Sequence, residues 1–570
     1  TLGAHPTAGT ISGGSEYTPV VVGGVVYLTT PTAVVAVEGD SGREVWRREI
    51  ERGTPSRRGA AYWPGDARLG ARIFLTSNKR LIALDSKSGE PAREFGDAGV
   101  VEMPVSYEGA PTVFESLVIV GSNTPPGGVR AYDARTGREV WEFLSVPQQG
   151  QPGHESWKDE AWRNNSGALH WPFSMTIDAE RRTLYGVFDA PGPFDYYGGD
   201  RPGDNLFGNS IVAIDVDTGK RLWHYQVVHH DLWDYDVPSP PGLLDATIGG
   251  ERVPLLAVAA KTGYLYILNR VTGEPVFGIE ERRVPASDVP GEAASPTQPI
   301  PVKPPPLSRV SFAASDIVTA EDTTPAHAAF CRNLAERSGR LVNAGSFTPY
   351  PFRAPGAPPV SLVLFPGSIG GANWGGTASD PSLGLYFVNT QDEASLGWIE
   401  RSPAGSPLPY RRNSAVGPTS RFQASEGDPE SGNIAGSGED AWPCQKPPWG
   451  RLFAIDATTG DVAWQVPLGI TDSLPEGKQR TGRLNMGGPI TTASGLVFIG
   501  ASNDRRFRAF GSRSGQELWS AKLAMSAHAV PVTYLGRDGK QYVGVTASGA
   551  AAIDNPSPPE ADAFVVFALP

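Results

Sequence analysis

The residues most able to do chemistry lie in one short stretch, HHDLWDYD (229–236), which holds three aspartates and two adjacent histidines. A lone pair of loop aspartates is usually a solvated surface feature, and adjacent histidines usually serve polar packing. Here aromatic residues separate the aspartates, and Pro238, Pro240 and Pro241 follow, so this part of the chain is stiff. Carboxylates that are crowded together and held rigid favour a bound cation or a base with a shifted pKa.

Two further stretches combine polar side chains with small residues. In GGANWGGTASDP (370–381), the glycines allow backbone to approach a ligand closely, while Asn373 offers an amide and Trp374 a flat face. In TPSRRGAAYWPGD (54–66), two arginines precede small residues and an aromatic pair. Taken singly, the first is a glycine-rich loop with a core tryptophan and the second a surface turn. Their meaning depends on the elements that position them.

A phrase repeated seven times identifies those elements: a short apolar run, Asp or a near substitute, a small linker, glycine and often tryptophan. Each copy predicts two strands joined by a tight turn, in which Asp and Ser/Thr bond the backbone and glycine supplies a positive φ. So short a unit cannot bury its own apolar face, so the copies must stack into a ring or an array. The copies span residues 34–46, 81–91, 129–141, 211–223, 266–277, 453–464 and 507–519.

Degenerate copies at 174–188 and 377–390 bring the total to about eight four-stranded units. We therefore expect an all-β fold, an eight-bladed β-propeller with four-stranded antiparallel blades, as a single domain over residues 1–570. Polar stretches rich in Pro, Gly and Ser, at about 279–360 and 401–447, are expected to be inserted loops over one face of the ring. The first of these is expected to lack regular strands and to hold a short helix near 327–339, and the last strand is expected to close the ring by pairing with the first unit.

The composition excludes several classes of protein. A formal net charge of −12 over 570 residues argues against nucleic acid or an anionic membrane surface as a partner. The sequence has no run of about 18 apolar residues, so no membrane span is expected. The chain begins with Thr and carries no basic-then-apolar leader, which is typical of a mature exported protein and equally of a trimmed chain. We expect a periplasmic protein whose signal peptide is absent from this chain.

The cysteines and the familiar catalytic motifs narrow the choice further. Cys331 and Cys444 are compatible with one structural disulfide outside the cytoplasm or with two inert buried thiols. There is no CxxCH sequence, so no covalently attached c-type haem is expected. The sequence also lacks GxSxG, HExxH and a GxGxxG between strand and helix, which argues against a hydrolase or a nicotinamide enzyme.

Four segments together resemble the quinoprotein alcohol and glucose dehydrogenases: HHDLWDYD (229–236), AAKTGYLYILNR (259–270), GGANWGG (370–376) and SRRGAAYW (56–63). Those enzymes carry pyrroloquinoline quinone (PQQ) at the axis of an eight-bladed propeller. The resemblance covers nearly the whole chain and is closest to the membrane glucose and quinate dehydrogenase branch, without that branch's N-terminal membrane helices. It implies that tryptophans ending the repeats dock neighbouring blades: Trp46, Trp141, Trp223, Trp464 and Trp519.

The resemblance also implies roles for matching residues. Asp234 takes the place of the base that accepts the proton of the substrate hydroxyl while hydride passes to the quinone. Lys261 takes the place of the cation that stabilises negative charge on the reduced quinone. The implied contacts of the cofactor are Glu16, Arg58, Trp171, Lys261, Asn373 and Trp374, among which the arginine suits a PQQ carboxylate. The implied reaction oxidises an alcohol, polyol or sugar to the carbonyl and passes electrons to an external quinone or cytochrome c.

The family binds a divalent cation, usually Ca²⁺, that bridges PQQ to the protein and polarises its carbonyl. The implied ligands are Asp189, Asp234, Asp236 and Asn123. The chain departs from the family pattern in GSNTPPGG (121–128), which holds a serine and Asn123 where relatives have a glutamate, and Asp189 replaces an asparagine. Since Asp236 occurs in lanthanide-dependent and in glucose-type relatives, Ca²⁺ is the expected ion, and a lanthanide or Mg²⁺ is the alternative.

A second function uses the same repeat. Non-catalytic propeller scaffolds for protein assembly carry it too, but a scaffold has no need of Asp234, Lys261 and Arg58 at the family positions. Within the family, the adjacent cysteines of methanol and ethanol enzymes are replaced by Thr54, Pro55 and Ser56, which disfavours that branch.

The substrate pocket is expected to take its walls from the loops at 143–170, 279–360 and 401–447. Their aromatic residues favour an apolar or ring-shaped substrate, such as a sugar, a cyclic polyol or a bulky secondary alcohol. The candidate wall residues are Tyr350, Phe352, Trp398, Tyr410 and Trp442.

Overall fold

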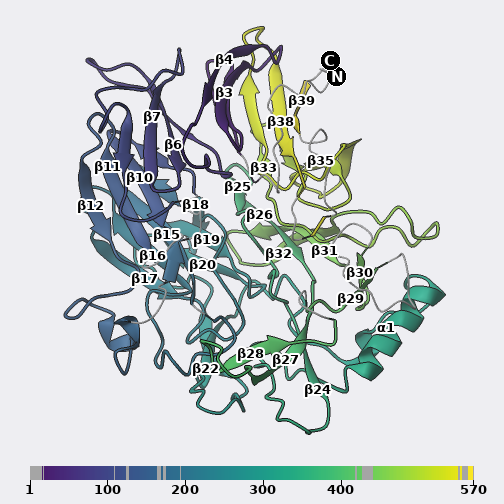
Figure 1. Ribbon diagram of the computed structural model, residues 1–570. Coiled ribbons are helices and arrows are strands. Elements are labelled where there is room, and N and C mark those ends of the chain that lie inside the picture. The colour runs from purple at the N-terminus through teal and green to yellow at the C-terminus, as the bar shows by residue number, and fades with distance from the viewer. Residues whose placement is uncertain are drawn as a thin grey trace.

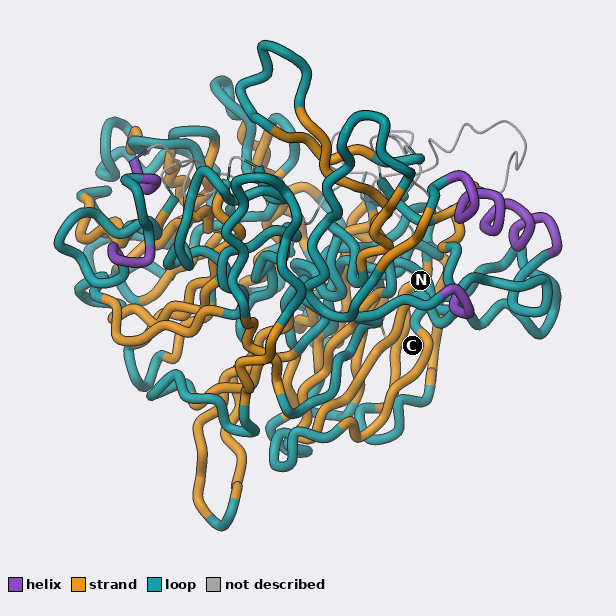
Figure 2. The backbone as a smooth tube through the Cα atoms, turned by 90° about the horizontal axis from the view of Figure 1, so that it is seen from below, coloured by secondary structure: helices purple, strands orange, loops and turns teal. Residues whose placement is uncertain are grey.

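The computed structural model describes residues 16, 18–107, 109–122, 127–163, 168–170, 175–192, 194–416, 420–425, 441–549, 553–554 and 563–568. The regular structure of these ranges is almost wholly strands, nearly all paired antiparallel, and helix α1 (Pro325–Arg337) lies at the edge of the molecule (Figure 1, Figure 2). The predicted all-β, propeller-like fold is confirmed. No helix within the described ranges has the length and apolar character needed to cross a membrane.

The sheets that carry the repeats follow one another along the chain, and their strands pair largely in sequence order. Sheet by sheet, they consist of β1 (Val20–Val22), β2 (Val25–Thr29), β3 (Ala33–Glu38) and β4 (Glu44–Glu49); β5 (Ala61–Trp63), β6 (Arg72–Ser77), β7 (Arg80–Asp85) and β8 (Val100–Glu102); β9 (Thr112–Phe114), β10 (Leu117–Ser122), β11 (Gly128–Asp133) and β12 (Glu139–Phe143); β13 (Ala168–His170), β14 (Thr176–Asp178), β15 (Thr183–Pro191), β16 (Ser210–Asp215) and β17 (Arg221–Gln226); β18 (Gly242–Ile248), β19 (Glu251–Ala259) and β20 (Leu265–Asn269); β25 (Ala378–Asp380), β26 (Leu385–Gln391), β31 (Gly450–Asp456) and β32 (Val462–Pro467); β33 (Ile490–Thr491), β34 (Leu496–Ile499), β35 (Arg506–Gly511) and β36 (Glu517–Lys522); and β37 (Val532–Leu535), β38 (Gln541–Ala547) and β39 (Ala563–Ala568).

The inserted stretches hold more regular structure than the sequence predicts. Their elements are the hairpin β21 (Ile279–Arg283) and β22 (Thr297–Pro301); the sheet β23 (Arg340–Val342), β24 (Val360–Leu364), β27 (Ser395–Arg401) and β28 (Tyr410–Asn413); the pair β29 (Gln423–Ser425) and β30 (Ala441–Pro443); and helix α1 (Pro325–Arg337). Short 3₁₀ turns are η1 (His154–Ser156), η2 (Ala161–Arg163) and η3 (Ala314–Asp316).

The expectation of no regular strands at 279–360 is therefore wrong. A two-stranded hairpin has two free edges, so Pro299 and Pro301 can occupy alternate positions of β22 without removing a hydrogen bond from the ladder. The predicted helix is confirmed as α1, which begins two residues earlier because Thr324 caps it and accepts a hydrogen bond from the His327 N–H.

Successive sheets are joined by the tryptophan that ends each repeat. Trp141 lies against Gly219 of the next repeat, where an added Cβ would be 2.6 Å from the ring, and its indole N–H donates to the Val216 carbonyl at 2.9 Å. The glycine is thus needed both for its φ of +72° and for the space above it. The same contact joins Trp46 to Gly89, Trp223 to Gly273 and Trp464 to Gly515.

Trp519 departs from this docking arrangement. It packs edge-on against Phe567 of the last sheet, with ring centroids 5.0 Å apart, and it remains 38% exposed. At the last sheet, the tryptophan therefore packs against a phenylalanine ring instead of a glycine.

The first and last sheets lie side by side, with β3 and β4 next to β38 and β39 (Figure 1). Val26 and Leu28 share a buried cluster with Tyr534 and Tyr542, and the Tyr534 hydroxyl donates to the Gly39 carbonyl at 2.8 Å. The expectation that the last strand pairs with the first unit is wrong for the described residues, because β39 pairs with β38 and not with β1–β4. Side-chain packing brings the two ends together instead.

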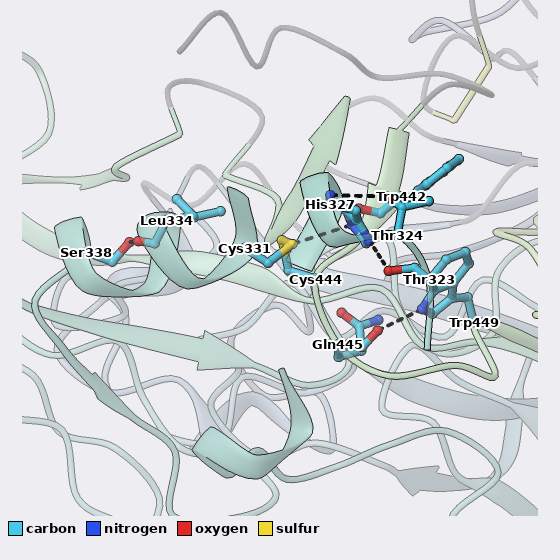
Figure 3. Close-up of a disulfide and its surroundings, with 10 residues drawn as sticks. All are labelled: Thr323, Thr324, His327, Cys331, Leu334, Ser338, Trp442, Cys444, Gln445 and Trp449. Atoms are coloured by element: carbon cyan, nitrogen blue, oxygen red, sulfur yellow. Dashed lines mark hydrogen bonds between the residues drawn. A yellow bond between two sulfur atoms is a disulfide. The ribbon is translucent and has the colours of Figure 1, made fainter. Parts of the chain in front are cut away.

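A disulfide fastens helix α1 to the end of the second insertion. Cys331 and Cys444 are bonded, which decides between the two states that the sequence left open. Figure 3 shows His327 beside them, with its Nδ1 2.8 Å from the Thr323 hydroxyl, and burial lowers the pKa of this histidine to about 4. Trp442, expected at the substrate pocket, packs edge-on against His327 in this cluster.

The tryptophan–glycine contact makes a direct prediction about stability. Gly219→Ala is expected to lower the thermal midpoint well below that of Gly539→Ala, because both glycines have φ near +75° but only the first faces a ring. The extra destabilisation should be about 1–3 kcal/mol, the usual cost of overpacking. Circular dichroism melts measure it, and equal midpoints for the two variants would contradict the docking role.

Candidate active site

The acidic loop 229–236 is wound around one of its own aspartates. The fully buried Asp231 carboxylate accepts hydrogen bonds from the N–H groups of Trp233 at 2.8 Å and Tyr235 at 2.7 Å, and from the Asn209 amide at 2.8 Å. Burial raises the pKa of Asp231 to about 6. Asp231 therefore holds the loop in shape, and both of its carboxylate oxygens are occupied by protein donors.

Lys261 joins the other two aspartates of the loop. It follows β19, and its Nζ lies 2.8 Å from Asp234 Oδ1 and 2.6 Å from Asp236 Oδ2. Asp236 also accepts a hydrogen bond from the Ala190 N–H at 2.8 Å. Asp234 pairs with Lys261, and its side chain is the most exposed of the three at 22%. Of the three aspartates, Asp234 has the carboxylate most open to a ligand.

The environment of Asp234 is unusual in backbone and in charge. Its φ of 63° lies in the left-handed region, a strained conformation that is concentrated at functional sites. Burial and the like charges of Asp236 and Asp195 hold the pKa of Asp234 well above its ordinary value, although Lys261 opposes them. The two carboxylates in turn raise the pKa of Lys261, so its ammonium stays charged.

The glycine-rich loop 370–376 packs directly on Lys261. A Cβ on Gly370 would lie 2.4 Å from Lys261 Cγ, and the Gly371 N–H donates to the Lys261 carbonyl at 2.9 Å. The glycines thus allow close approach of backbone to this lysine. Asn373 donates to the Ile369 carbonyl at 2.6 Å and accepts the Trp374 N–H at 2.9 Å, so its amide holds the loop in shape.

Glu16, Arg58 and Trp374 form a second polar group. Arg58 makes an ion pair with Glu16, and its guanidinium carbon lies 5.6 Å from the centre of the Trp374 ring. The Trp374 indole donates to the His528 carbonyl at 3.0 Å. The structure therefore brings three of the expected cofactor residues together, with a guanidinium placed to receive a carboxylate.

The remaining expected residues differ in what the structure says of them. Trp171 and Asn123 lie outside the described residues. Asp189 is half-buried at the end of β15, and its carbonyl accepts the Asn209 N–H at 3.0 Å. Among the described residues, a compact group of three metal-ligating side chains occurs at His327 and the two bonded cysteines, and none occurs at Asp189, Asp234 and Asp236.

Several site residues were missed by the sequence reasoning. Asp195, in the loop after β15, has its pKa raised by burial and by Asp236. On β28, the Arg412 guanidinium lies 4.1 Å from the Tyr196 ring. Beneath Trp374, the buried His528 imidazole lies 2.7 Å from Asp554. Acidic and aromatic composition at 194–200 is a weak signal for the first of these, and the sequence carries no signal for the others.

The charges of the site fit an anionic planar cofactor and a hard cation. The Arg58 guanidinium, against an aromatic face, is suited to an acidic oxygen of a ring. At Lys261, the two carboxylates of Asp234 and Asp236 share one ammonium. Carboxylate oxygens in excess are the donors that Ca²⁺ and related ions prefer.

Comparison with known proteins points the same way. The PQQ family model described as glucose/ethanol/alcohol dehydrogenase, β-propeller domain, matches residues 3–543. The chain is 34% identical to the quinate/shikimate dehydrogenase (quinone) of Acinetobacter baylyi, over 99% of this chain and 74% of that protein. It is 30% identical to the quinoprotein glucose dehydrogenase of Escherichia coli, over 98% of this chain and 72% of that protein.

Among solved structures, the fold is similar to the quinohemoprotein alcohol dehydrogenase from Comamonas testosteroni, with a TM-score of 0.66 and 24% identity. The match covers 98% of this chain and 75% of that one. At this identity, the likeness shows a shared fold.

The division of roles within the acidic loop can be tested by matched substitutions. Asp231→Asn is expected to destabilise the protein by about 1–3 kcal/mol, because one of its carboxylate oxygens becomes an NH₂ group facing buried donors. Asp234→Asn should leave the thermal midpoint unchanged or raised, since its carboxylate bonds no backbone N–H among the described residues. Denaturation curves decide between them, and a larger loss in Asp234→Asn would overturn the assignment.

Proposed function

The chain belongs to the PQQ-dependent glucose/ethanol/alcohol dehydrogenase family, and on this premise we propose that it oxidises a hydroxyl group of a cyclic or secondary alcohol, polyol or sugar to the carbonyl. The observation that carries the proposal is the contact of Lys261 with Asp234 and Asp236. Buried charges are costly to maintain, and a scaffold would gain nothing from them. The alternative of a non-catalytic scaffold accounts for the repeats alone.

In the proposed reaction, Asp234 accepts the proton of the substrate hydroxyl at its open carboxylate. Its raised pKa makes it a stronger base than an exposed aspartate, and its strained backbone fixes the direction of the carboxylate. Lys261 supplies a fixed positive charge where negative charge develops. When bound, PQQ supplies the acceptor for the hydride.

The residues proposed to hold PQQ are those of the second polar group and the loop next to it. Arg58 receives a carboxylate of the cofactor and Trp374 lies along its ring. Asn373 keeps the loop closed against Lys261. Glu16 and Trp171 are proposed as further contacts.

A divalent or trivalent cation is proposed beside the cofactor, with Ca²⁺ preferred over Mg²⁺ or a lanthanide. Its proposed ligands are Asp189, Asp234, Asp236 and Asn123. The excess of carboxylates over cations around Lys261 supports this assignment, because a cation relieves their repulsion.

The wider organisation follows from the same premise. We propose that the repeat sheets are eight blades of a single domain over residues 1–570, supported by the buried clusters between successive sheets and between the first and last. An external quinone or cytochrome c is proposed as the electron acceptor, since the name of the relative from Acinetobacter baylyi specifies a quinone. A periplasmic location is supported by the disulfide, which persists in oxidising compartments.

Asp234→Asn provides the direct test of the base. Dye-linked oxidation of alcohols by the PQQ- and Ca²⁺-loaded protein is expected to fall by about 10²–10⁴-fold, the usual contribution of a general base. The absorption of bound PQQ should persist, which separates lost chemistry from lost cofactor. Asp159→Asn is the matched control, because Asp159 is exposed and also has a positive φ of 53°. Full turnover by Asp234→Asn would refute the role.

Removal of the metal provides a second test. Protein stripped with a chelator and given PQQ alone is expected to be inactive, since its clustered carboxylates then lack their counter-ion. Addition of Ca²⁺, Mg²⁺ or La³⁺ should restore dye reduction to different extents, with Ca²⁺ most effective. Equal activity with and without every ion would contradict a metal in the reaction.

A further inference from the structure

We propose that Arg412 binds a carboxylate on the substrate, so that the protein selects hydroxylated ring acids over uncharged alcohols. This inference rests on the proposed oxidation at Asp234 and names the substrate class for that site.

Arg412 lies on an aromatic platform supplied by two other segments. Its guanidinium is 4.1 Å from the centre of the Tyr196 ring and donates to the Tyr350 hydroxyl at 3.4 Å. The two tyrosine rings meet edge to face, with centroids 5.5 Å apart. Tyr350 is one of the aromatic wall residues expected from the sequence, and it is almost fully buried. The platform therefore presents a cation beside surfaces that suit a carbon ring.

No carboxylate in the described ranges lies within ion-pair distance of Arg412, whose hydrogen bond to the Tyr350 hydroxyl is long at 3.4 Å. Lys261, Arg58 and Arg421 each have an acidic partner, whereas the fully buried Arg201 donates to the Asn205 side chain and to the Asp231 carbonyl. The carboxylates of Asp195, Asp234 and Glu393 act on Arg412 from beyond ion-pair distance. Burial of a charge is costly unless it is paired, so an anion in direct contact with Arg412 would be stabilised there.

The free side of this guanidinium is open to a ligand. The other N–H groups of Arg412 have no protein partner among the described residues, and they are accessible to solvent. The Tyr196 hydroxyl is likewise accessible and without a protein partner there. Planar N–H groups in a fork match the two oxygens of a carboxylate. Arg412 thus has the donors and the access that recognition of an anion requires.

The position of Arg412 relates it to the reacting hydroxyl. Tyr350 shares one buried cluster with Trp233 and Tyr235, the neighbours of Asp234, and Tyr196 packs against this cluster. The charge of Asp234 also contributes to raising the pKa of Arg412 and that of Tyr196. A single molecule can therefore place a hydroxyl at Asp234 and an acid group at Arg412, with its ring along Tyr196. A hydroxylated ring acid meets all three conditions.

The test compares an acid with its uncharged ester in the PQQ- and Ca²⁺-loaded protein. For quinate and methyl quinate, the wild type is expected to favour the acid in kcat/KM, and Arg412→Gln should lower kcat/KM for the acid by about 10- to 100-fold while sparing the ester. Arg412→Lys should recover part of the preference. The matched control is Arg411→Gln, since Arg411 neighbours Arg412 on β28 but is exposed and paired with Glu400.

Equal losses for the acid and the ester in Arg412→Gln would overturn the inference, and so would lost PQQ absorption, because Arg412 would then serve the cofactor. If no alcohol is oxidised at all, the proposed function fails, and calorimetry still decides the inference. Cyclohexanecarboxylate, but not cyclohexanol, should then bind the wild type and Arg411→Gln and not Arg412→Gln. Binding that ignores the carboxylate or the arginine would refute the assignment.

Discussion

The contact between an indole ring and the glycine of the next repeat is the constraint on which the other elements depend. The indole N–H is fixed by a backbone carbonyl and the ring face by the missing side chain, as Trp141 is fixed by Val216 and Gly219. At the four junctions that have this contact, one sheet is thereby held at a fixed distance and orientation from the next, whereas Gly137 and Gly460 face Val101 and Phe277 instead. The loops between sheets then meet although they are far apart in sequence, as Arg58 meets Trp374.

Within that frame, the acidic loop divides its aspartates by their partners. Asp231 is surrounded by donors and holds the loop, and Asp236 is shared between Lys261 and the Ala190 N–H. Asp234 is left with the lysine and a more open carboxylate. The cost of burying these charges is offset locally by hydrogen bonds and one ammonium, which the protein supplies itself.

The sequence predicts those parts of the molecule in which chemistry and repetition leave a pattern. The repeats predict the sheets. The family resemblance implies the docking tryptophans, four of which are confirmed, and assigns Asp234 and Lys261 to one site, but their direct contact was not predicted. The packing of Trp519 and the pairing of β39 were not predicted correctly, because no further repeat follows them in the sequence to give a pattern. The sequence did not decide whether Cys331 and Cys444 are bonded, because a separation of 113 residues along the chain says nothing about their distance in space. Arg412 lies in an insertion and Asp195 in the loop after β15, and neither segment has a periodic pattern, so only the folded chain reveals their neighbours.

This difference in predictability has a physical counterpart in how the site is supported. Asp234 lies in the loop between β17 and β18, which belong to successive repeat sheets, and Lys261 lies in the turn between β19 and β20 of one sheet. Arg412 comes from β28, which belongs to a separate sheet with β23, β24 and β27. That sheet shares a buried cluster with the cysteines of the disulfide, through Leu341 and Leu396. Through Ile399 and Tyr410 it also shares a second buried cluster with Trp233 and Tyr235, the neighbours of Asp234. The base and the proposed substrate cation thus come from different sheets but rest on one packed cluster. Substitutions that repack this cluster are therefore expected to change both the choice of substrate and the position of Asp234.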